Sequence, residues 1–222
     1  SSAASDVYKR QILLIPASLI AITVHEFSHG YMSYKLGDPT ARNLGRLTLN
    51  PIKHIDIIGL LCMILFRFGW AKPVPVNSRY YKKPRRDMAL VGAAGPLSNI
   101  LLGFIGVICF EFTWLLFPKV EFQSTAYYIV FTAHTFFVLF ANINVYLALF
   151  NLIPIPPLDG SRIFYVFLPP KAYFGIMKYE KYIMLVLVIL MFTHVFSGTI
   201  GWLGDKVIGG MMRLVELIPI FR

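Results

Sequence analysis

The 222-residue chain is 57% hydrophobic and only 14% charged, whereas soluble domains carry about 25% charged residues. This composition, with its several long uncharged runs, excludes an ordinary soluble domain and predicts a polytopic membrane protein. The formal net charge of +10 does not indicate nucleic-acid binding. The basic residues cluster in short loops beside apolar runs, where contact with anionic lipid headgroups explains them.

The polar start of the chain, residues 1–11, differs from the apolar residues after it. It lacks the apolar core and the small-residue cleavage site of a secretory signal, so we expect a tail without function, either flexible or artefactual. The core of the protein is expected over 12–205. Residues 206–222 form a mildly amphipathic tail that suits the membrane interface.

The first apolar stretch, residues 12–34, is long enough to cross a bilayer as one helix. Its second half holds His25, Glu26 and His29 in the pattern H-E-x-x-H. On a helix the two histidines lie on one face, so both imidazoles can bind one zinc ion while Glu26 handles protons. Such side chains are costly inside hydrocarbon and mark a functional site by default.

Residues 57–70 are apolar but short for a full crossing, which predicts either a tilted short span or a re-entrant segment. The most basic loop of the chain, residues 71–86, comes next, and we expect it in the cytoplasm. Its prolines forbid a regular helix, so we expect 71–77 to form an edge strand or a small β-hairpin.

A second long span is predicted over 88–110, with small residues on its early turns that favour close helix packing. No charged residue occurs from 122 to 158, and residues 182–204 form the last clear span. The sequence therefore predicts an all-α polytopic membrane protein with about five to six membrane helices or re-entrant segments.

Asn151 and Asp159 stand on either side of a proline-rich break at membrane depth. Irregular backbone at that depth is tolerated only where it is buried in protein or lines a watery cavity. A bound cation would explain the aspartate. Alternatively, Asp159 caps the short helix that begins near Ser161, or it pairs with Arg162.

A catalytic zinc has three protein ligands and one open position, so one more residue must join the histidine pair. Asp159 is the best candidate because it is buried and comes after a structured break, with no obvious basic partner inside the membrane. The other candidates are His54, His134, His194 and Glu111. Glu111 lies near a helix end, and packing or a hydrogen bond is the plainer role for His134.

Two motifs together, HEFSHG at 25–30 and NLIPIPPLDG at 151–160, resemble the site-2 protease family of intramembrane zinc metalloproteases. The resemblance is to its short members without PDZ or CBS modules, and it extends over about residues 12–205. It implies an integral protein of the prokaryotic cytoplasmic membrane, with an active site that opens toward the cytoplasm. The oligomeric state is not implied.

By the family pattern, the single zinc ion of each chain would be held by His25, His29 and Asp159. Glu26 would be the catalytic carboxylate, which takes a proton from the attacking water and passes it to the leaving amine. The partners would be the lipid bilayer and a membrane protein whose transmembrane segment is the substrate.

The substrate helix must be opened before cleavage, because a helix hides its carbonyl groups. An edge strand at 71–77 could hold the unwound substrate by strand addition. An amide side chain could help to stabilise the oxyanion. Asn151 is the first candidate for that role and Asn142 and Asn144 are rivals, although interhelical hydrogen bonding would also explain all three.

Two other functions compete with proteolysis. A zinc transporter also uses intramembrane histidine and aspartate, but it predicts inverted repeats and often a second site, and the sequence shows one compact site and no repeats. A non-proteolytic protein that binds membrane helices is the other alternative, and the intact Glu26 argues against it.

Overall fold

The computed structural model describes residues 2–57, 59, 71–169, 172, 175–176, 178–193 and 195–221. Within these ranges the secondary structure is helical, apart from an isolated antiparallel bridge between Ile55 and Ala71. Three helical stretches of the described chain are long and apolar enough to cross a membrane: Arg10–Lys35, Pro84–Lys119 and Thr125–Asn151. The predicted segment at 57–70 lies outside the described residues, except for 57 and 59.

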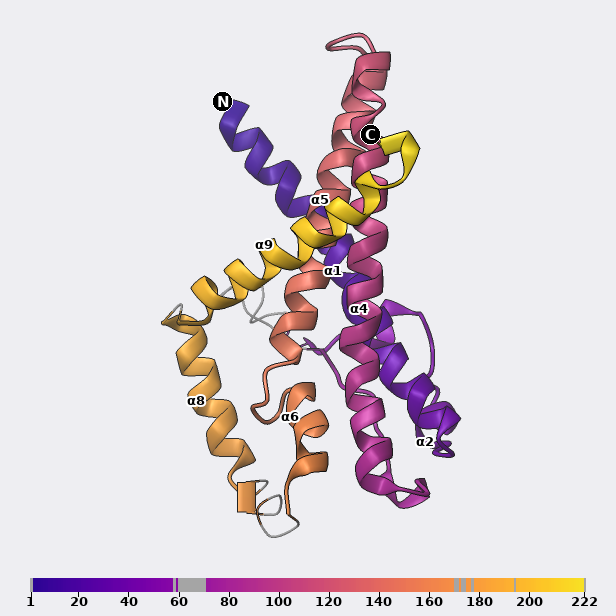
Figure 1. The fold of residues 1–222 in the computed structure, drawn as a ribbon, viewed down its shortest axis with the longest axis vertical. Coiled ribbons are helices and arrows are strands. Elements are labelled where there is room, and N and C mark those ends of the chain that lie inside the picture. The colour runs from indigo at the N-terminus through magenta and orange to yellow at the C-terminus, as the bar shows by residue number, and fades with distance from the viewer. Residues whose placement is uncertain are drawn as a thin grey trace. The chain divides into compact units, whose positions relative to one another are not determined.

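The chain divides into two compact units, and helices α1, α4 and α5 (Figure 1) contribute residues to both. The first unit contains Ser1–Ala21, Asn99–Leu149 and Ser197–Arg222. The second unit contains Ile22–Ser98 and Phe150–Phe196.

Helix α1 (Ser2–Lys35) includes most of the residues that we expected to form a polar tail. Its carboxyl end closes in a Schellman motif, in which Gly37 has a φ of +104°. The Asp38 N–H donates to the Ser33 carbonyl and the Gly37 N–H donates to the Tyr34 carbonyl, both at 3.1 Å. This arrangement satisfies carbonyls that the helix end would leave unpaired and turns the chain out of α1.

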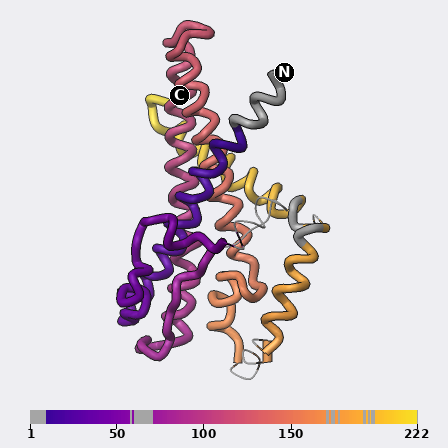
Figure 2. The backbone as a smooth tube through the Cα atoms, turned by 180° about the vertical axis from the view of Figure 1, so that it is seen from behind, coloured from indigo at the N-terminus to yellow at the C-terminus, as the bar shows by residue number. Residues whose placement is uncertain are grey.

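In the described part of the chain between α1 and α4, drawn in purple in Figure 2, the buried carboxylate of Asp38 connects the end of α1 to residues 40 and 77. This carboxylate accepts hydrogen bonds from the Ser33 hydroxyl at 2.8 Å and from the N–H groups of Thr40 at 2.9 Å and Asn77 at 2.7 Å. Burial alone would raise the pKa of Asp38, but these bonds outweigh it and lower the pKa. The short helices of this region are α2 (Thr40–Asn43), η1 (Pro51–His54) and η2 (Ser78–Tyr80).

The predicted β-hairpin at 71–77 is not formed. Ala71 makes the single bridge to Ile55, and the remaining residues of the segment carry no regular structure. Pro73 and Pro75 lack the N–H groups that a strand ladder needs. The N–H of Val74, which lies between them, donates instead to a carboxylate side chain of α1.

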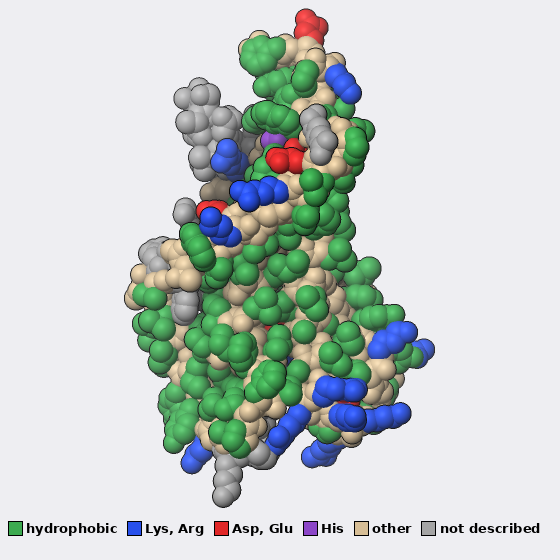
Figure 3. Space-filling model, viewed as in Figure 1, with side chains coloured by type: hydrophobic (Ala, Val, Ile, Leu, Met, Phe, Trp, Pro, Cys, Tyr) green, Lys and Arg blue, Asp and Glu red, His purple; other side chains and the backbone are tan. Residues whose placement is uncertain are grey.

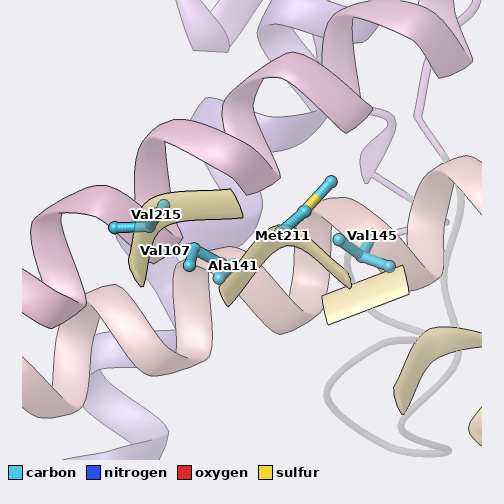
Figure 4. Close-up of a cluster of buried hydrophobic side chains, with 5 residues drawn as sticks. All are labelled: Val107, Ala141, Val145, Met211 and Val215. Carbon is cyan, nitrogen blue, oxygen red and sulfur yellow. The ribbon is translucent and has the colours of Figure 1, made fainter. Parts of the chain in front are cut away.

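In the first unit, the second half of α4 (Pro84–Trp114) packs with α5 (Thr125–Asn151) and α9 (Val195–Glu216). Figure 4 shows the buried aliphatic side chains that these helices bring together, which are Val107, Ala141, Val145, Met211 and Val215. Their burial holds this unit together without a charged group in the cluster.

The predicted span at 182–204 is broken in the structure. Helix α8 (Glu180–Phe192) ends before Thr193, and α9 begins at Val195 and continues to Glu216, beyond the predicted end. Between α5 and α8 lie α6 (Asp159–Phe164) and η4 (Tyr165–Phe167). Two further 3-10 turns, η3 (Phe117–Lys119) and η5 (Pro219–Phe221), come after α4 and α9.

Candidate metal centre

The two histidines of the H-E-x-x-H pattern lie one turn apart on α1, as the sequence predicted. They belong to the second unit. Both are buried, with exposed fractions of 6% for His25 and 5% for His29. Their Nε2 atoms are 3.0 Å apart and so converge on one point.

Asp159, from the first turn of α6, completes this group. Its Oδ2 atom lies 3.1 Å from His25 Nε2 and 3.0 Å from His29 Nε2. Within the described chain, these three residues form the group of histidine, cysteine and acidic side chains that could hold a metal ion. The carboxylate is buried with the histidines, at an exposed fraction of 7%.

The spacing of the three atoms fits zinc. Ligand atoms bound tetrahedrally at about 2.0–2.1 Å from zinc lie about 3.3 Å from one another, close to the separations found here. A purely hydrogen-bonded cluster fits less well, because a carboxylate oxygen only accepts and the two facing imidazole nitrogens cannot both donate to each other. A cation at the centre satisfies all three atoms at once.

A hydrogen bond on the far side of His29 fixes which nitrogen faces the cluster. His29 Nδ1 lies 2.7 Å from the carbonyl oxygen of Val91. Because a carbonyl only accepts, Nδ1 carries the proton and donates it. The Nε2 lone pair of neutral His29 is therefore directed at the site, which is the orientation that a metal ligand requires.

Gly95 of α4 makes room for the imidazoles. A methyl group at this position would lie 2.6 Å from His29 Cε1 and 2.7 Å from His25 Cε1, which is closer than real contacts allow. From the sequence, this glycine was only part of a small-residue run that favours packing. That run was the available signal, but it does not say that histidines are what packs there.

The D-G pair at 159–160 has a structural reason as well as a chemical one. A Cβ on Gly160 would lie 2.6 Å from the Ile153 carbonyl oxygen, so only glycine lets the proline-rich segment pass this close to α6. On the facing helix, a Cβ on Gly92 would approach the Asp159 carbonyl oxygen at 3.1 Å. Glycines in α4 and α6 therefore set the position of the aspartate.

Two alternative roles were considered for Asp159, capping the short helix α6 and pairing with Arg162. Leu158 is the N-cap of α6 and no side chain caps this helix end, so the capping interpretation is wrong. Arg162 Nη1 lies 3.9 Å from Asp159 Oδ1, at the limit of an ion pair. The two carboxylate oxygens thus have separate neighbours, since Oδ2 faces the histidines and Oδ1 faces the arginine.

Glu26 is half-buried and lies beside the histidines in sequence, but its carboxylate is not one of the three converging groups. Its Oε2 atom accepts a 2.8 Å hydrogen bond from the N–H of Val74. Val74 is itself buried, with an exposed fraction of 7%. The segment at 71–77 therefore contacts α1 at the H-E-x-x-H turn.

The other ligand candidates lie elsewhere. His54 is buried and its Nε2 donates to the Thr48 carbonyl at 2.8 Å. His134 contacts the Thr113 hydroxyl at 3.0 Å among aromatic rings, which is the packing role that we preferred. Glu111 is not in the described metal-binding group, and His194 lies outside the described residues.

The asparagine candidates differ in their surroundings. Asn144 Oδ1 accepts from Asn99 Nδ2 at 2.8 Å, and Asn144 Nδ2 donates to the Phe140 carbonyl at 2.9 Å. This buried pair belongs to the first unit and joins α4 to α5. The Asn142 amide donates to the Val138 carbonyl at 2.7 Å. Asn151 is the last residue of α5 and is half-buried.

A buried His–His–Asp cluster, in a chain with helices long and apolar enough to cross a membrane, is typical of a membrane metalloprotein, and comparison with known proteins agrees. The sequence model of the family described as "Peptidase family M50" matches residues 13–194. This match covers most of the chain, which therefore belongs to peptidase family M50.

Curated relatives carry the printed name "Putative zinc metalloprotease". The chain is 41% identical to "Putative zinc metalloprotease YwhC" of Bacillus subtilis over 180 residues, covering 81% of this chain and 80% of the relative. It is 27% identical to the Rip2 protein of Mycolicibacterium smegmatis over 186 residues, covering 82% and 67%. The identity to MJ0611 of Methanocaldococcus jannaschii is 30% over 158 residues, covering 68% and 71%. No solved structure gives a significant match.

The protein is thus an intramembrane zinc metalloprotease of the site-2 protease type, and the resemblance drawn from the two motifs is confirmed. Membership of this family favours the protease over the zinc transporter and the non-proteolytic scaffold. The zinc cofactor accords with the cluster of His25, His29 and Asp159.

Proposed function

We propose that this protein hydrolyses peptide bonds in or near transmembrane segments of other membrane proteins. In this proposal His25, His29 and Asp159 hold one zinc ion and Glu26 moves the protons. The observation that carries the proposal is the convergence of His25 Nε2, His29 Nε2 and Asp159 Oδ2 within 3.1 Å of one another.

A bound zinc supplies a Lewis acid and lowers the pKa of a coordinated water toward 7. The residues of the chain do the rest. His29 is held in the ligating tautomer by its bond to Val91. Glu26, next to His25 on the same helical turn, accepts the proton of the attacking water and returns it to the leaving amine. Its partial exposure suits a group that must reach water.

The Val74 N–H has a defined part in this proposal. It is the one backbone donor within Pro73–Pro75, because the prolines have none, and it binds the Glu26 carboxylate. This hydrogen bond holds the Glu26 carboxylate in one orientation before substrate arrives.

Substrate docking by strand addition is less well supported than the sequence suggested. The N–H groups of Lys72, Val74 and Asn77 already donate to the His54 carbonyl, Glu26 and Asp38. An added strand would have to displace some of these bonds. Unchanged cleavage after replacement of both Val74 and Val76 by polar residues would count against docking on this segment.

Asn151 is our candidate for oxyanion stabilisation, because it belongs to the same unit as His25, His29 and Asp159, whereas Asn144 belongs to the first unit. Loss of such a donor costs about 10²–10³ in kcat. An Asn151→Asp variant, which keeps the size but loses the donor, should show this loss at unchanged zinc content. An Asn144→Asp variant should instead affect stability.

We place the protein in the prokaryotic cytoplasmic membrane, with the site open to the cytoplasm and the bilayer as its surroundings. The basic loop at 71–86 supports this orientation. The proposal also keeps about five to six membrane segments. It keeps the protease core at 12–205 and the interfacial tail at 206–222. Single cysteines at 79 and 121, labelled from either side in sealed vesicles, would test the orientation.

The variant Glu26→Gln tests the function. Cleavage of a single-span substrate in nanodiscs should fall by about 10²–10⁴-fold, the contribution of a general base, while the zinc content stays at that of wild type. Glu121→Gln, an exposed position with the same chemical change, is the matched control and should cleave normally. Cleavage by Glu26→Gln at the wild-type rate would overturn the proposal.

A further inference from the structure

A cavity of about 310 Å³ lies in the second unit, between the start of α4 and the segment formed by α6 and η4. Its polar lining comes from Ser78, Arg85 and Arg162. Met88, Val166 and the ring of Tyr165 supply much of its apolar lining. The site is thus an amphipathic hollow with two guanidinium groups.

The positive charge of this cavity is not neutralised by its own walls. None of its lining residues is acidic. Among the residues that the structure describes, the acidic partner of Arg162 is Asp159, whose Oδ1 lies 3.9 Å from Arg162 Nη1. Arg85 makes no ion pair within the described chain, whereas its neighbour Arg86 pairs with Asp87 at 2.8 Å. The cavity therefore has two arginines and no acidic residue in its lining.

We propose that this cavity binds a phosphate group, presented by the headgroup of an anionic phospholipid or by free phosphate. Guanidinium groups match the oxygens of phosphate with paired, charge-assisted hydrogen bonds. The Ser78 hydroxyl adds a neutral donor. The cavity also lies at the first turn of α4, where the helix dipole favours an anion.

The surroundings favour the lipid as the source. Lys and Arg side chains gather at the lower end of the face in Figure 3, and they include the basic loop before α4. Basic clusters beside membrane helices attract anionic lipids. Phe164 lies within the segment Arg162–Val166 and Phe167 directly follows it; they are exposed at 52% and 83% and offer apolar surface to acyl chains.

The proposed phosphate would share an arginine with the metal centre. Arg162 reaches the cavity from the same helix turn that carries Asp159, and it faces the carboxylate oxygen that the histidines do not use. This connection leads us to keep Arg162 unchanged in the test and to vary Arg85 and Ser78 instead.

The test uses the full, zinc-loaded chain in neutral detergent, with lipid binding measured by native mass spectrometry. Phosphatidylglycerol is compared with diacylglycerol of the same acyl chains, which lacks the phosphate. Wild type should bind phosphatidylglycerol preferentially. Arg85→Gln should weaken that binding about tenfold and Ser78→Ala about threefold, as expected for losing a charged and a neutral donor. Thermal unfolding of each variant shows that it is folded.

Arg79→Gln is the matched control, because Arg79 is an exposed arginine of the same basic loop that does not line the cavity. It should bind within about twofold of wild type. Titration with inorganic phosphate is the second arm. Phosphate binding that depends on Arg85, with no preference for phosphatidylglycerol, would assign the site to the free anion. Equal effects of Arg85→Gln and Arg79→Gln in both arms, or no binding in either, would overturn the proposal.

Discussion

Helix α4 contains two pairs of glycines with the same spacing, Gly92 with Gly95 and Gly103 with Gly106, and the two pairs meet different neighbours. In the second unit, Gly95 faces His25 and His29, and Gly92 faces the backbone of Asp159 and the side chain of Arg162. In the first unit, Gly103 and Gly106 face Val145 and Ala141 of α5.

The comparison separates two uses of the same sequence pattern. One glycine pair lets two helices approach closely, which is the usual role of small residues in membrane proteins. The other pair lets ionisable side chains and a helix start converge beside α4. A methyl group added at Gly92 or Gly95 should therefore weaken metal binding, whereas one added at Gly103 or Gly106 should lower the stability of the fold.

The largest effect is expected for Gly95→Ala. The new Cβ would lie 2.6 Å from His29 Cε1, so an imidazole or the helix must move. Because the ligand atoms must hold their positions to bind zinc, we expect the zinc content, measured by inductively coupled plasma mass spectrometry, to fall below about a tenth of wild type. Cleavage should fall with it. A Gly95→Ala variant that still binds zinc fully would contradict the separate roles of the two glycine pairs.

A smaller loss of zinc is expected for Gly92→Ala. Its Cβ would meet Arg162 Cβ at 3.0 Å and the Asp159 carbonyl oxygen at 3.1 Å, so α6 must shift by a few tenths of an ångström. We expect about tenfold weaker zinc binding, measured by competition with a chelating dye, which is typical of a disturbed ligand support. Unchanged affinity would show that α6 accommodates the methyl group freely.

Gly106→Ala should leave the zinc in place and lower stability. The added methyl group would lie 3.0 Å from the backbone nitrogen of Ala141, which cannot rotate away. Overpacking of this kind costs about 1–3 kcal/mol, and the better helix propensity of alanine returns about 0.5–1 kcal/mol. A detergent-unfolding titration should show the net loss. Reduced zinc content in this variant would contradict the separate roles.

The smallest effect, and one of opposite sign, is expected for Gly210→Ala in α9. A Cβ there meets nothing within 4 Å, so the change should stabilise the protein by about 0.4–1 kcal/mol through the unfolded chain. Unfolding measured as for Gly106→Ala gives the comparison. Destabilisation by Gly210→Ala would show that this face of α9 has a partner.

Spacing and the cost of burying polar groups were enough to predict which three side chains the structure brings together as a candidate metal centre. His25 and His29 share a helix face by periodicity, and Asp159 could be chosen because a buried aspartate after a proline-rich break needs a cation. Gly95 could not be assigned, because a small-residue run predicts close approach but does not name the neighbour. Val74 was also missed, since its contact with Glu26 joins positions 48 residues apart.

Two predictions about the fold failed for physical reasons. The segment at 71–77 was expected to form an edge strand because its prolines forbid a helix and are tolerated at sheet edges. The same prolines remove donors, and the N–H groups of Lys72, Val74 and Asn77 bind a carbonyl and two side chains instead of a second strand. The run at 182–204 has no Asp, Glu, Lys or Arg, and hydropathy alone does not reveal the break between α8 and α9.

X-ray absorption at the zinc edge of the purified protein tests the metal centre most directly. We expect about two imidazole nitrogens and one carboxylate oxygen at about 2.0–2.2 Å, with a light fourth ligand and no sulfur. Asp159→Ala should lose the carboxylate signal and most of the zinc. A zinc spectrum with sulfur ligands, or one that Asp159→Ala leaves unchanged, would contradict the coordination by His25, His29 and Asp159.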